Sequence, residues 1–163
     1  MDRYVYEAAD EEATAALGAA LAEVLPEAAV VALCGTLGAG KTRLVQAIAE
    51  ACGVDRRDVV SPTFVLAHEY RGRRTVYHLD AYRLRDEEEF LALGPEEYFE
   101  KRAITLVEWA DRVAACLPRD HLEVRIEVTG ESSRRVELIA HGQSMAEALG
   151  RLQSAMWKPA KPA

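Results

Sequence analysis

Residues 35–42 read GTLGAGKT and fit the pattern G-x-x-x-x-G-K-[ST] at every position. Glycines at this spacing let successive backbone N–H groups turn inward, where they form a concave site for phosphate oxygens. In such a loop the Lys41 ammonium reaches the β- and γ-phosphates of a nucleotide, and the Thr42 hydroxyl is placed to bind Mg²⁺. The stretch therefore predicts a phosphate-binding loop, called the P-loop below, that opens into a helix.

The segments on both sides of the P-loop predict an α/β sheet. Val30–Leu33 is a continuous apolar run, typical of a strand buried on both faces of a parallel sheet, and Ile104–Val107 is another. A helix is expected from Lys41 to about Cys52, where Gly53 ends it. Strand, glycine-rich loop and helix in this order are the setting that a phosphate site requires.

The rest of the chain alternates short strands and helices. The expected elements are an edge strand at Tyr4–Tyr6, a helix from the N-cap Asp10 to about Leu25, hairpin strands at Phe64–Tyr70 and Thr75–Leu79, helical turns at Asp86–Leu93 and through Phe99, hairpin strands at Leu122–Thr129 and Val136–Ala140, and a helix at Met145–Ala155. We therefore expect a single-domain, P-loop NTPase-like α/β fold over residues 1–157, with a mixed, mostly parallel central sheet and flanking helices. A disordered tail is expected at 158–163.

Composition and charge exclude several classes of protein. The chain has 163 residues, of which 50% are hydrophobic, and neither a secretory signal nor an apolar run near the roughly 20 residues that span a bilayer. We therefore expect a cytoplasmic protein that does not contact membranes. The net charge of −7 argues against wrapping nucleic acid with this chain alone, because such binding depends on Lys and Arg. Arginine runs such as Arg71–Arg74 are interpreted as solvated loops, with a patch for an acidic partner as the alternative.

The nucleotide is predicted to be ATP. A guanine-specific GTPase normally carries the motif N/T-K-x-D, and this chain contains no Asn and no Thr-Lys pair. The three cysteines share no C-x-x-C spacing, which argues against a zinc site or a disulfide framework.

Two acidic residues directly follow strand-like segments. Asp80 comes after Thr75–Leu79, and Glu108 comes after Ile104–Val107. Side chains at the carboxyl ends of strands in an α/β sheet face the crevice where ligands bind. Because a P-loop needs a carboxylate from a neighbouring strand to complete its metal site, both residues are candidates. A surface acid that merely closes a strand is the alternative for each.

Four blocks of sequence together resemble a known family. Besides the P-loop they are SPTF at 61–64, YHLDAYRL at 77–84 and LVEWA at 106–110. Their order and content closely resemble the TsaE (YjeE) family, over nearly the whole chain. The resemblance implies an ATPase subunit, slow alone and dependent on partners, that serves the threonylcarbamoyladenosine modification of tRNA. It further implies TsaD and TsaB as partners, with contact to tRNA indirect through that complex.

The resemblance also implies roles for individual residues. It assigns Lys41, Asp80 and Glu108 to catalysis, with Asp80 orienting water or the metal shell near the γ-phosphate, and it assigns Thr42 and Glu108 to Mg²⁺. The segment Ser61–Phe64 is expected to act as a switch loop that senses the γ-phosphate. The nucleotide itself is assigned to Glu11, Gly38, Ala39, Gly40, Lys41, Thr42, Arg43, Trp109 and Arg135, with Glu11 and Arg135 near the base or ribose.

Two residues in these blocks, Thr36 and His78, need separate interpretation. The family usually has an acidic residue where this chain has Thr36, which leaves ATP binding intact but puts a contribution of that carboxylate to hydrolysis in doubt. His78 invites assignment as a general base, although a satisfied core or interface histidine is the favoured interpretation.

Two other functions fit the same P-loop. A small-molecule kinase would need an arginine-rich lid over the transferred phosphoryl group, for which Arg71–Arg74 is the only candidate. A nucleotide-gated binding module with negligible hydrolysis would use the same loop as an ATPase, so the sequence does not separate the two.

Overall fold

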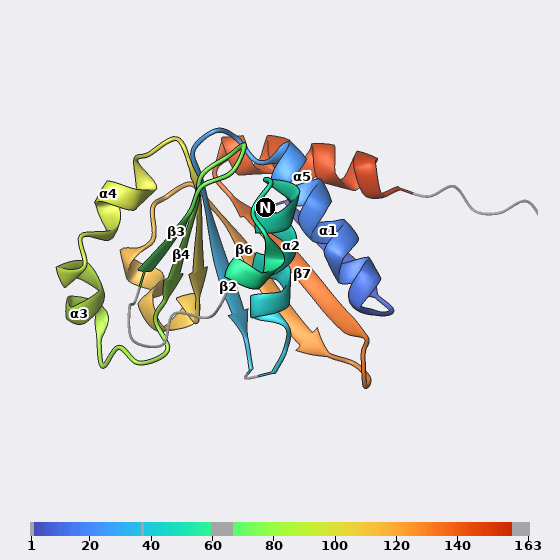
Figure 1. Ribbon diagram of the computed structural model, residues 1–163, viewed down its shortest axis with the longest axis horizontal. Coiled ribbons are helices and arrows are strands. Elements are labelled where there is room, and N and C mark those ends of the chain that lie inside the picture. Colours follow the sequence, from blue (N-terminus) through green and yellow to red (C-terminus); the bar gives the residue numbers. More distant parts are fainter. Residues whose placement is uncertain (1, 37, 60–66, 158–163) are drawn as a thin grey trace, which may run out of the picture.

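Seven strands form one sheet in the computed structural model, which describes residues 2–36, 38–59 and 67–157 (Figure 1). The strands are β1 (Arg3–Ala8), β2 (Ala29–Gly35), β3 (Ala67–Tyr70), β4 (Val76–Asp80), β5 (Ile104–Glu108), β6 (His121–Val128) and β7 (Arg134–His141). The helices are α1 (Glu11–Val24), α2 (Lys41–Ala51), α3 (Glu87–Ala92), α4 (Pro95–Phe99) and α5 (Gln143–Met156), with 3₁₀ helices η1 (Arg56–Asp58) and η2 (Ala110–Cys116). None of the helices in these ranges is both long and apolar enough to cross a membrane.

The strand order is β1-β7-β6-β2-β5-β4-β3. The four central strands, β6, β2, β5 and β4, run parallel to one another, whereas β1, β7 and β3 join antiparallel at the two sides. The expected α/β fold with a mixed sheet and a parallel centre is therefore confirmed. Both expected hairpins are present as β3–β4 and β6–β7; the first residues of the former, and the expected tail at 158–163, lie outside the described residues.

Parallel pairing gives the sheet two chemically different ends. The strands β2, β4 and β5 finish side by side at Gly35, Asp80 and Glu108, and we call this the carboxyl end of the sheet. They begin together at the opposite end, called the amino end below. Two sequence-distant carboxylates thus reach the same place as the P-loop, because parallel neighbours point their carboxyl ends the same way.

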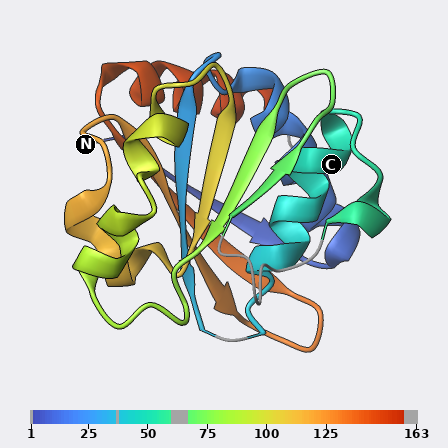
Figure 2. The same ribbon diagram turned by 60° about the vertical axis from the view of Figure 1, so that its left-hand side comes forward.

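Helices cover both faces of the sheet (Figure 2). On one face α1, α2 and α5 bury a core that includes Leu17, Leu44, Ile48 and Leu152. On the other face α3, α4 and η2 enclose a smaller core around Phe90 and other apolar side chains. Helix α2, which begins at Lys41, is thus held on the sheet by its own apolar stripe.

Local signals explain which helices the sequence predicts. The Asp10 carboxylate accepts a hydrogen bond from the Ala13 N–H at 2.9 Å and so caps α1 where expected. The sequence does not predict the 3₁₀ helix η2, because no side chain within the described ranges caps it and its backbone is not helical at Val113. It nevertheless follows β5 directly, and so it determines how the chain leaves the carboxyl end of the sheet.

Candidate nucleotide-binding site

The P-loop connects the carboxyl end of β2 to the start of α2. Gly38 and Gly40 have φ angles of 80° and 106°, a region that side chains rarely adopt, so glycine at these positions allows the turn. No side chain in the described part of the chain caps α2. The start of α2 is an anion-binding position, because the N–H groups and the dipole of a first helical turn point toward the preceding loop. Leu37, within the loop, lies outside the described residues.

The Lys41 side chain folds against its own loop. It is only 5% exposed, and its Nζ donates to the carbonyl oxygens of Gly35 at 2.5 Å and Thr36 at 2.9 Å. The same nitrogen lies 3.8 Å from the centroid of the Trp109 ring, a cation–π contact. Burial lowers the pKa of Lys41, and the nearby carboxylates of Glu108, Asp111 and Asp80 oppose that shift. The ammonium is thus desolvated beside the loop where phosphate is expected.

Glu108 ends β5 and contacts the start of α2. It is 3% exposed, and the Thr42 hydroxyl donates to its Oε1 at 3.1 Å. Its other oxygen, Oε2, lies 2.5 Å from Nε2 of His78 on β4. The two residues that the resemblance assigns to Mg²⁺ are therefore in direct contact, although 66 positions separate them in the sequence.

Asp80 lies beside Glu108. The two carboxylates occupy paired positions of the neighbouring strands β4 and β5, and so they face the same side of the sheet. Asp80 accepts a hydrogen bond from the Tyr82 N–H at 2.8 Å. Burial raises the pKa of the Asp80 carboxyl, and the neighbouring Glu108 adds to the rise, while the Tyr82 hydrogen bond opposes it. The site thus places Asp80 where the neighbouring Glu108 carboxylate makes it harder to ionise.

Trp109 follows Glu108 with an unusual backbone. Its φ is 58°, the one positive value among the non-glycine residues that the structure describes. The indole packs against the Tyr82 ring, with centroids 4.9 Å apart, and it also makes the cation–π contact with Lys41. A non-glycine residue in this conformation is held there by its surroundings, and such residues are concentrated at functional sites. Trp109 therefore lies against the P-loop lysine, and its expected contact with a nucleotide stays a prediction.

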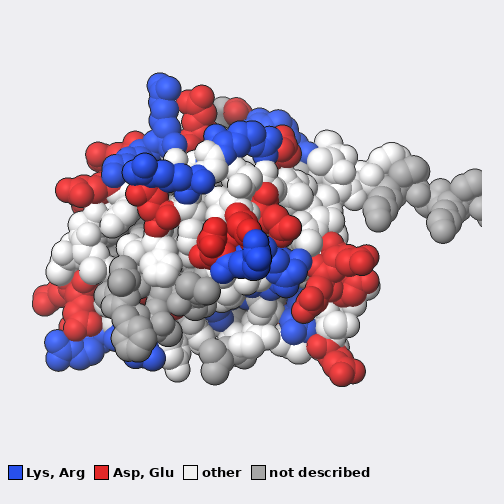
Figure 3. All heavy atoms as spheres, viewed as in Figure 1, with Lys and Arg blue, Asp and Glu red and all other residues white. Residues whose placement is uncertain are grey.

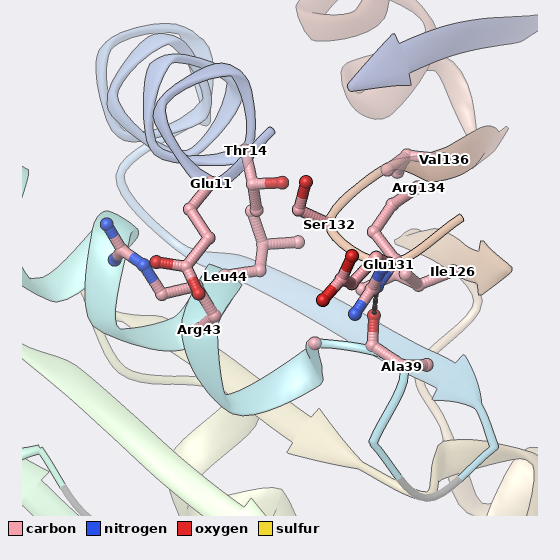
Figure 4. Close-up of a pocket in the computed structure, with 11 residues that line it drawn as sticks. Glu11, Thr14, Ala39, Arg43, Leu44, Ile126, Glu131, Ser132, Arg134 and Val136 are labelled. Carbon is pink, nitrogen blue, oxygen red and sulfur yellow. Dashed lines mark hydrogen bonds between the residues drawn. The ribbon is translucent and has the colours of Figure 1, made fainter. Parts of the chain in front are cut away.

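A pocket adjoins the P-loop on the side of β6 and β7 (Figure 4). It encloses about 100 Å³ and lies between the start of α1, the first turn of α2 and the β6–β7 turn. Glu11, from α1, and Glu131, from the turn, lie on opposite sides of it in Figure 4. Its polar lining comprises Glu11, Thr14, Arg43, Glu131, Ser132 and Arg134.

Arg134, rather than the expected Arg135, belongs to this pocket. Its Nε donates to the Ala39 carbonyl at 2.8 Å, which ties the β6–β7 turn to the P-loop. Side chains alternate along β7, so Arg134 shares a face with the buried Val136 while the exposed Arg135 points to the other face. Sequence reasoning missed Arg134, although the apolar alternation of Val136 and Leu138 was a signal that could have found it.

Arg43, one residue after Thr42, lines the same pocket. Its Nε and Nη1 are buried and have no hydrogen-bond partner among the described residues. Buried polar atoms are normally paired, so unpaired guanidinium nitrogens beside a P-loop are consistent with an acceptor supplied by a ligand. Glu11 and Arg43 are thus both brought to the pocket, whereas Ser61–Phe64 lies outside the described residues.

Arginines at the amino end of the sheet have a different use. Arg74 donates to the carbonyl oxygens of Ala22 and Leu25, both at 2.9 Å, and of Pro26 at 2.5 Å, at the end of α1. Arg73 donates to the Ala51 carbonyl at the end of α2. These contacts satisfy the last carbonyl groups of α1 and α2. The P-loop lies at the opposite end of α2. The loop that could have formed a kinase lid is therefore not near the P-loop.

The oxygen ligands at the carboxyl end fit Mg²⁺. The Thr42 hydroxyl and the Glu108 carboxylate are hard donors of the kind that Mg²⁺ prefers, and they are already adjacent. The described ranges contain no group of three or more His, Cys, Asp or Glu side chains that could hold a metal ion. At nucleotide sites Mg²⁺ usually takes one or two protein ligands and completes its shell with phosphate and water.

Comparison with known proteins agrees with this geometry. The sequence profile of one family, described as "Threonylcarbamoyl adenosine biosynthesis protein TsaE", matches residues 8–136. The chain belongs to the TsaE family. The matched range of this TsaE chain includes the P-loop, Asp80, Glu108 and Arg134, so every part of the site described above lies inside it.

Individual relatives extend the match to nearly the full TsaE chain. A Bacillus subtilis protein named "tRNA threonylcarbamoyladenosine biosynthesis protein TsaE" is 36% identical over 155 residues, which cover 93% of this chain and 96% of the relative. Proteins of the same name from Treponema pallidum and Nostoc sp. are 37% and 40% identical and cover 76% and 80% of this chain. The crystal structure of Bacillus subtilis YdiB superposes with a TM-score of 0.80 at 28% identity, covering 94% of this chain and 96% of that one.

Proposed function

We propose that this chain binds ATP with Mg²⁺ and hydrolyses it as a component of tRNA threonylcarbamoyladenosine biosynthesis. The names of its relatives support the pathway. The observation that carries the chemistry is the contact of the Thr42 hydroxyl with Glu108, with Asp80 on the next strand. A phosphate loop, a metal carboxylate and a second carboxylate at one place are the parts that nucleotide hydrolysis needs.

The P-loop and Lys41 would bind the phosphates. Lys41 now donates to two carbonyls of its own loop, and an incoming phosphate offers a charged acceptor in their place. Because Lys41 is already desolvated, its attraction to the β- and γ-phosphates is strong and needs little further loss of water.

Thr42 and Glu108 would hold the metal ion. The ion held by these two residues would supply positive charge beside the phosphates, where negative charge develops during hydrolysis. Asp80, one strand further from the P-loop, would orient the attacking water and accept its proton. Its raised pKa suits a group that must take up a proton at neutral pH.

The pocket beside β6 and β7 would hold the ribose and base of ATP. Glu11 and Glu131 can accept hydrogen bonds from sugar hydroxyls or an exocyclic amine. Arg43 can donate from Nε and Nη1, which have no partner among the residues that the structure describes. This proposal moves the sequence-based assignment from Arg135 to Arg134, whose guanidinium is tied to the P-loop carbonyl of Ala39.

The hydrolysis would be slow in the isolated chain and faster with TsaD and TsaB. Lys and Arg are interspersed with Asp and Glu on the face seen in Figure 3, with no continuous basic stripe there. Together with the net charge of −7, this supports an indirect contact with tRNA through the partner proteins. A partner could add a cation to the transition state, an effect worth about 10³–10⁵ in rate in other P-loop proteins.

A steady-state phosphate-release assay with and without TsaD and TsaB tests the proposal. We expect slow release by the chain alone and a large stimulation by the two partners. Phosphoryl transfer to an acceptor other than water would instead identify a kinase. Tight ATP binding with no phosphate release in any mixture would identify a nucleotide-gated binding module.

A further inference from the structure

His78 is a fully buried polar residue in the middle of β4, and it touches the candidate active site. Its exposure is 0%, and its Nε2 lies 2.5 Å from the Glu108 Oε2. It lies two positions before Asp80 on the same strand, so both side chains face the same side of the sheet. The proposed hydrolysis assigns no role to this contact.

The contact fixes the direction in which Glu108 points. A carboxylate oxygen accepts a hydrogen bond from an imidazole N–H, so Nε2 of His78 is the donor to Oε2. The other oxygen, Oε1, accepts the hydroxyl of Thr42 at 3.1 Å. Each oxygen therefore has its own partner, and rotation of the carboxylate about its last bond would break both hydrogen bonds.

His78 is itself held from behind. Its Nδ1 lies 3.3 Å from the Tyr70 hydroxyl, which also lies 3.3 Å from Nδ1 of His68. The register of β3 and β4 places His68 opposite His78, and Tyr70 is buried two residues further along β3. A chain of hydrogen bonds thus runs from the edge strand β3 through His78 to Glu108, and it orients the imidazole ring.

We infer that His78, oriented by Tyr70, is a positioning residue for Glu108 in the metal site. Metal ligands commonly depend on such outer partners, whose loss weakens metal affinity about 10–100-fold. The inference rests on the proposed function, because it assigns Glu108 to Mg²⁺. It differs from the role of a core histidine, whose hydrogen bonds would contribute to stability alone.

Side-chain replacements at position 78 separate the two roles. His78→Gln keeps an amide N–H near the position of the imidazole Nε2. His78→Asn keeps an amide N–H near the position of Nδ1, and its side chain is too short to reach Glu108. His78→Phe keeps the ring volume and removes both nitrogens. Tyr70→Phe removes only the hydroxyl behind the ring. Thr105→Val is a matched control, because Thr105 is a buried β5 residue that donates to the Tyr98 carbonyl and is not hydrogen-bonded to Glu108.

The measurement is the Mg²⁺ concentration that gives half-maximal binding of a fluorescent ATP analogue, beside binding in EDTA and the melting temperature. We expect His78→Asn and His78→Phe to raise the Mg²⁺ midpoint about tenfold or more, with binding in EDTA unchanged. His78→Gln should stay within about threefold of the natural protein, and Tyr70→Phe should lie between them. Thr105→Val should lower the melting temperature without moving the midpoint.

The outcomes discriminate between the two proposals. Equal midpoints for His78→Gln and His78→Asn would overturn the inference, and this pair decides even if His78→Phe does not fold. A shift in melting temperature without a shift in midpoint would likewise leave His78 as a core residue. If the natural protein bound the ATP analogue with no dependence on Mg²⁺, the proposed function itself would fail.

Discussion

The two ends of the sheet use charged residues in opposite ways. At the carboxyl end Lys41 and Glu108 are buried and Asp80 is half-buried, and burial displaces the pKa values of Lys41 and Asp80 in the direction that disfavours charge. At the amino end the partly exposed Arg74 donates four hydrogen bonds to carbonyls at the end of α1. At one end burial disfavours the charged forms of Lys41 and Asp80, whereas at the other end carbonyl oxygens of the fold accept hydrogen bonds from the Arg74 guanidinium.

Because of this difference, substitutions at the two ends of the sheet should affect activity and stability separately. Desolvated charges at the carboxyl end cost folding free energy, so their removal should lower activity without lowering stability. Arginines at the amino end complete the hydrogen bonding of helix ends, so their removal should lower stability without lowering activity.

Lys41→Ala should reduce hydrolysis at least about 100-fold, because a preorganised charge is removed from the phosphate site. The melting temperature should stay the same or rise, since a buried ammonium is lost with it. Single-turnover hydrolysis and thermal unfolding measure the two effects. Lys101→Ala is the control, because Lys101 also lies over an aromatic ring, that of Tyr77, at 5.3 Å. Normal turnover by the folded Lys41→Ala protein would refute the assignment of the P-loop.

Asp80→Asn should lower the single-turnover rate about 100-fold while ATP·Mg²⁺ binds nearly as before, because an interaction made chiefly in the transition state is lost. Glu108→Gln should instead raise the Mg²⁺ concentration that binding requires. The intrinsic fluorescence of Trp109 can report binding once Trp157, which is 71% exposed, is replaced by Phe. The reverse pattern in the two variants would mean that their roles are exchanged.

Asp80→Asn should also stabilise the nucleotide-free protein in a pH-dependent manner. The folded state raises the pKa of the Asp80 carboxyl, so the folded chain binds its proton more tightly than the unfolded chain, whose pKa is about 3.9. The stability of the natural protein therefore falls as the pH rises from about 3.9 through the raised pKa of the folded state. The difference in melting temperature should be near zero at pH 3.5 and favour Asp80→Asn at pH 7; an unchanged difference would contradict the shift.

Arg74→Ala should destabilise the protein by about 1.5–3 kcal/mol, the usual contribution of hydrogen bonds that involve a charged group. Hydrolysis per folded molecule should remain within twofold of normal, because the substitution lies at the amino end. Urea unfolding measures the first effect. Arg71→Ala provides the contrast, since Arg71 pairs only with the exposed Glu69 among the described residues and should contribute little. Equal losses for the two variants would remove the proposed difference between them.

His121→Gln is expected to change stability least, and only at mildly acidic pH. Burial lowers the pKa of His121, the stacked His141 adds to the shift, and a hydrogen bond to the Pro118 carbonyl opposes it. The unfolded chain therefore binds the proton more tightly, and stability is complete above about pH 6.5 and declines as the pH falls below it. His121→Gln should lose less stability between pH 7.5 and 5.5. Parallel unfolding curves for the two proteins over this range would argue against the prediction.

The sequence alone determined the P-loop, the central fold and the two candidate carboxylates. Each depends on a local pattern: glycine spacing at 35–42, continuous apolar runs in β2 and β5, and an acid directly after a strand. Such patterns can be found in the sequence because each depends on the conformation or burial of a few consecutive residues. The resemblance of four such blocks then identified the family.

Only the tertiary structure decided which side chains meet. The contact of Thr42 with Glu108, and of Glu108 with His78, depends on the pairing of β2, β5 and β4, which no single segment encodes. The choice of Arg134 over Arg135 likewise depends on which face of β7 the core covers. Burial of the whole sheet between two layers of helices sets which strands pair and which face each side chain occupies. These contacts therefore follow from the complete fold and not from any single sequence motif.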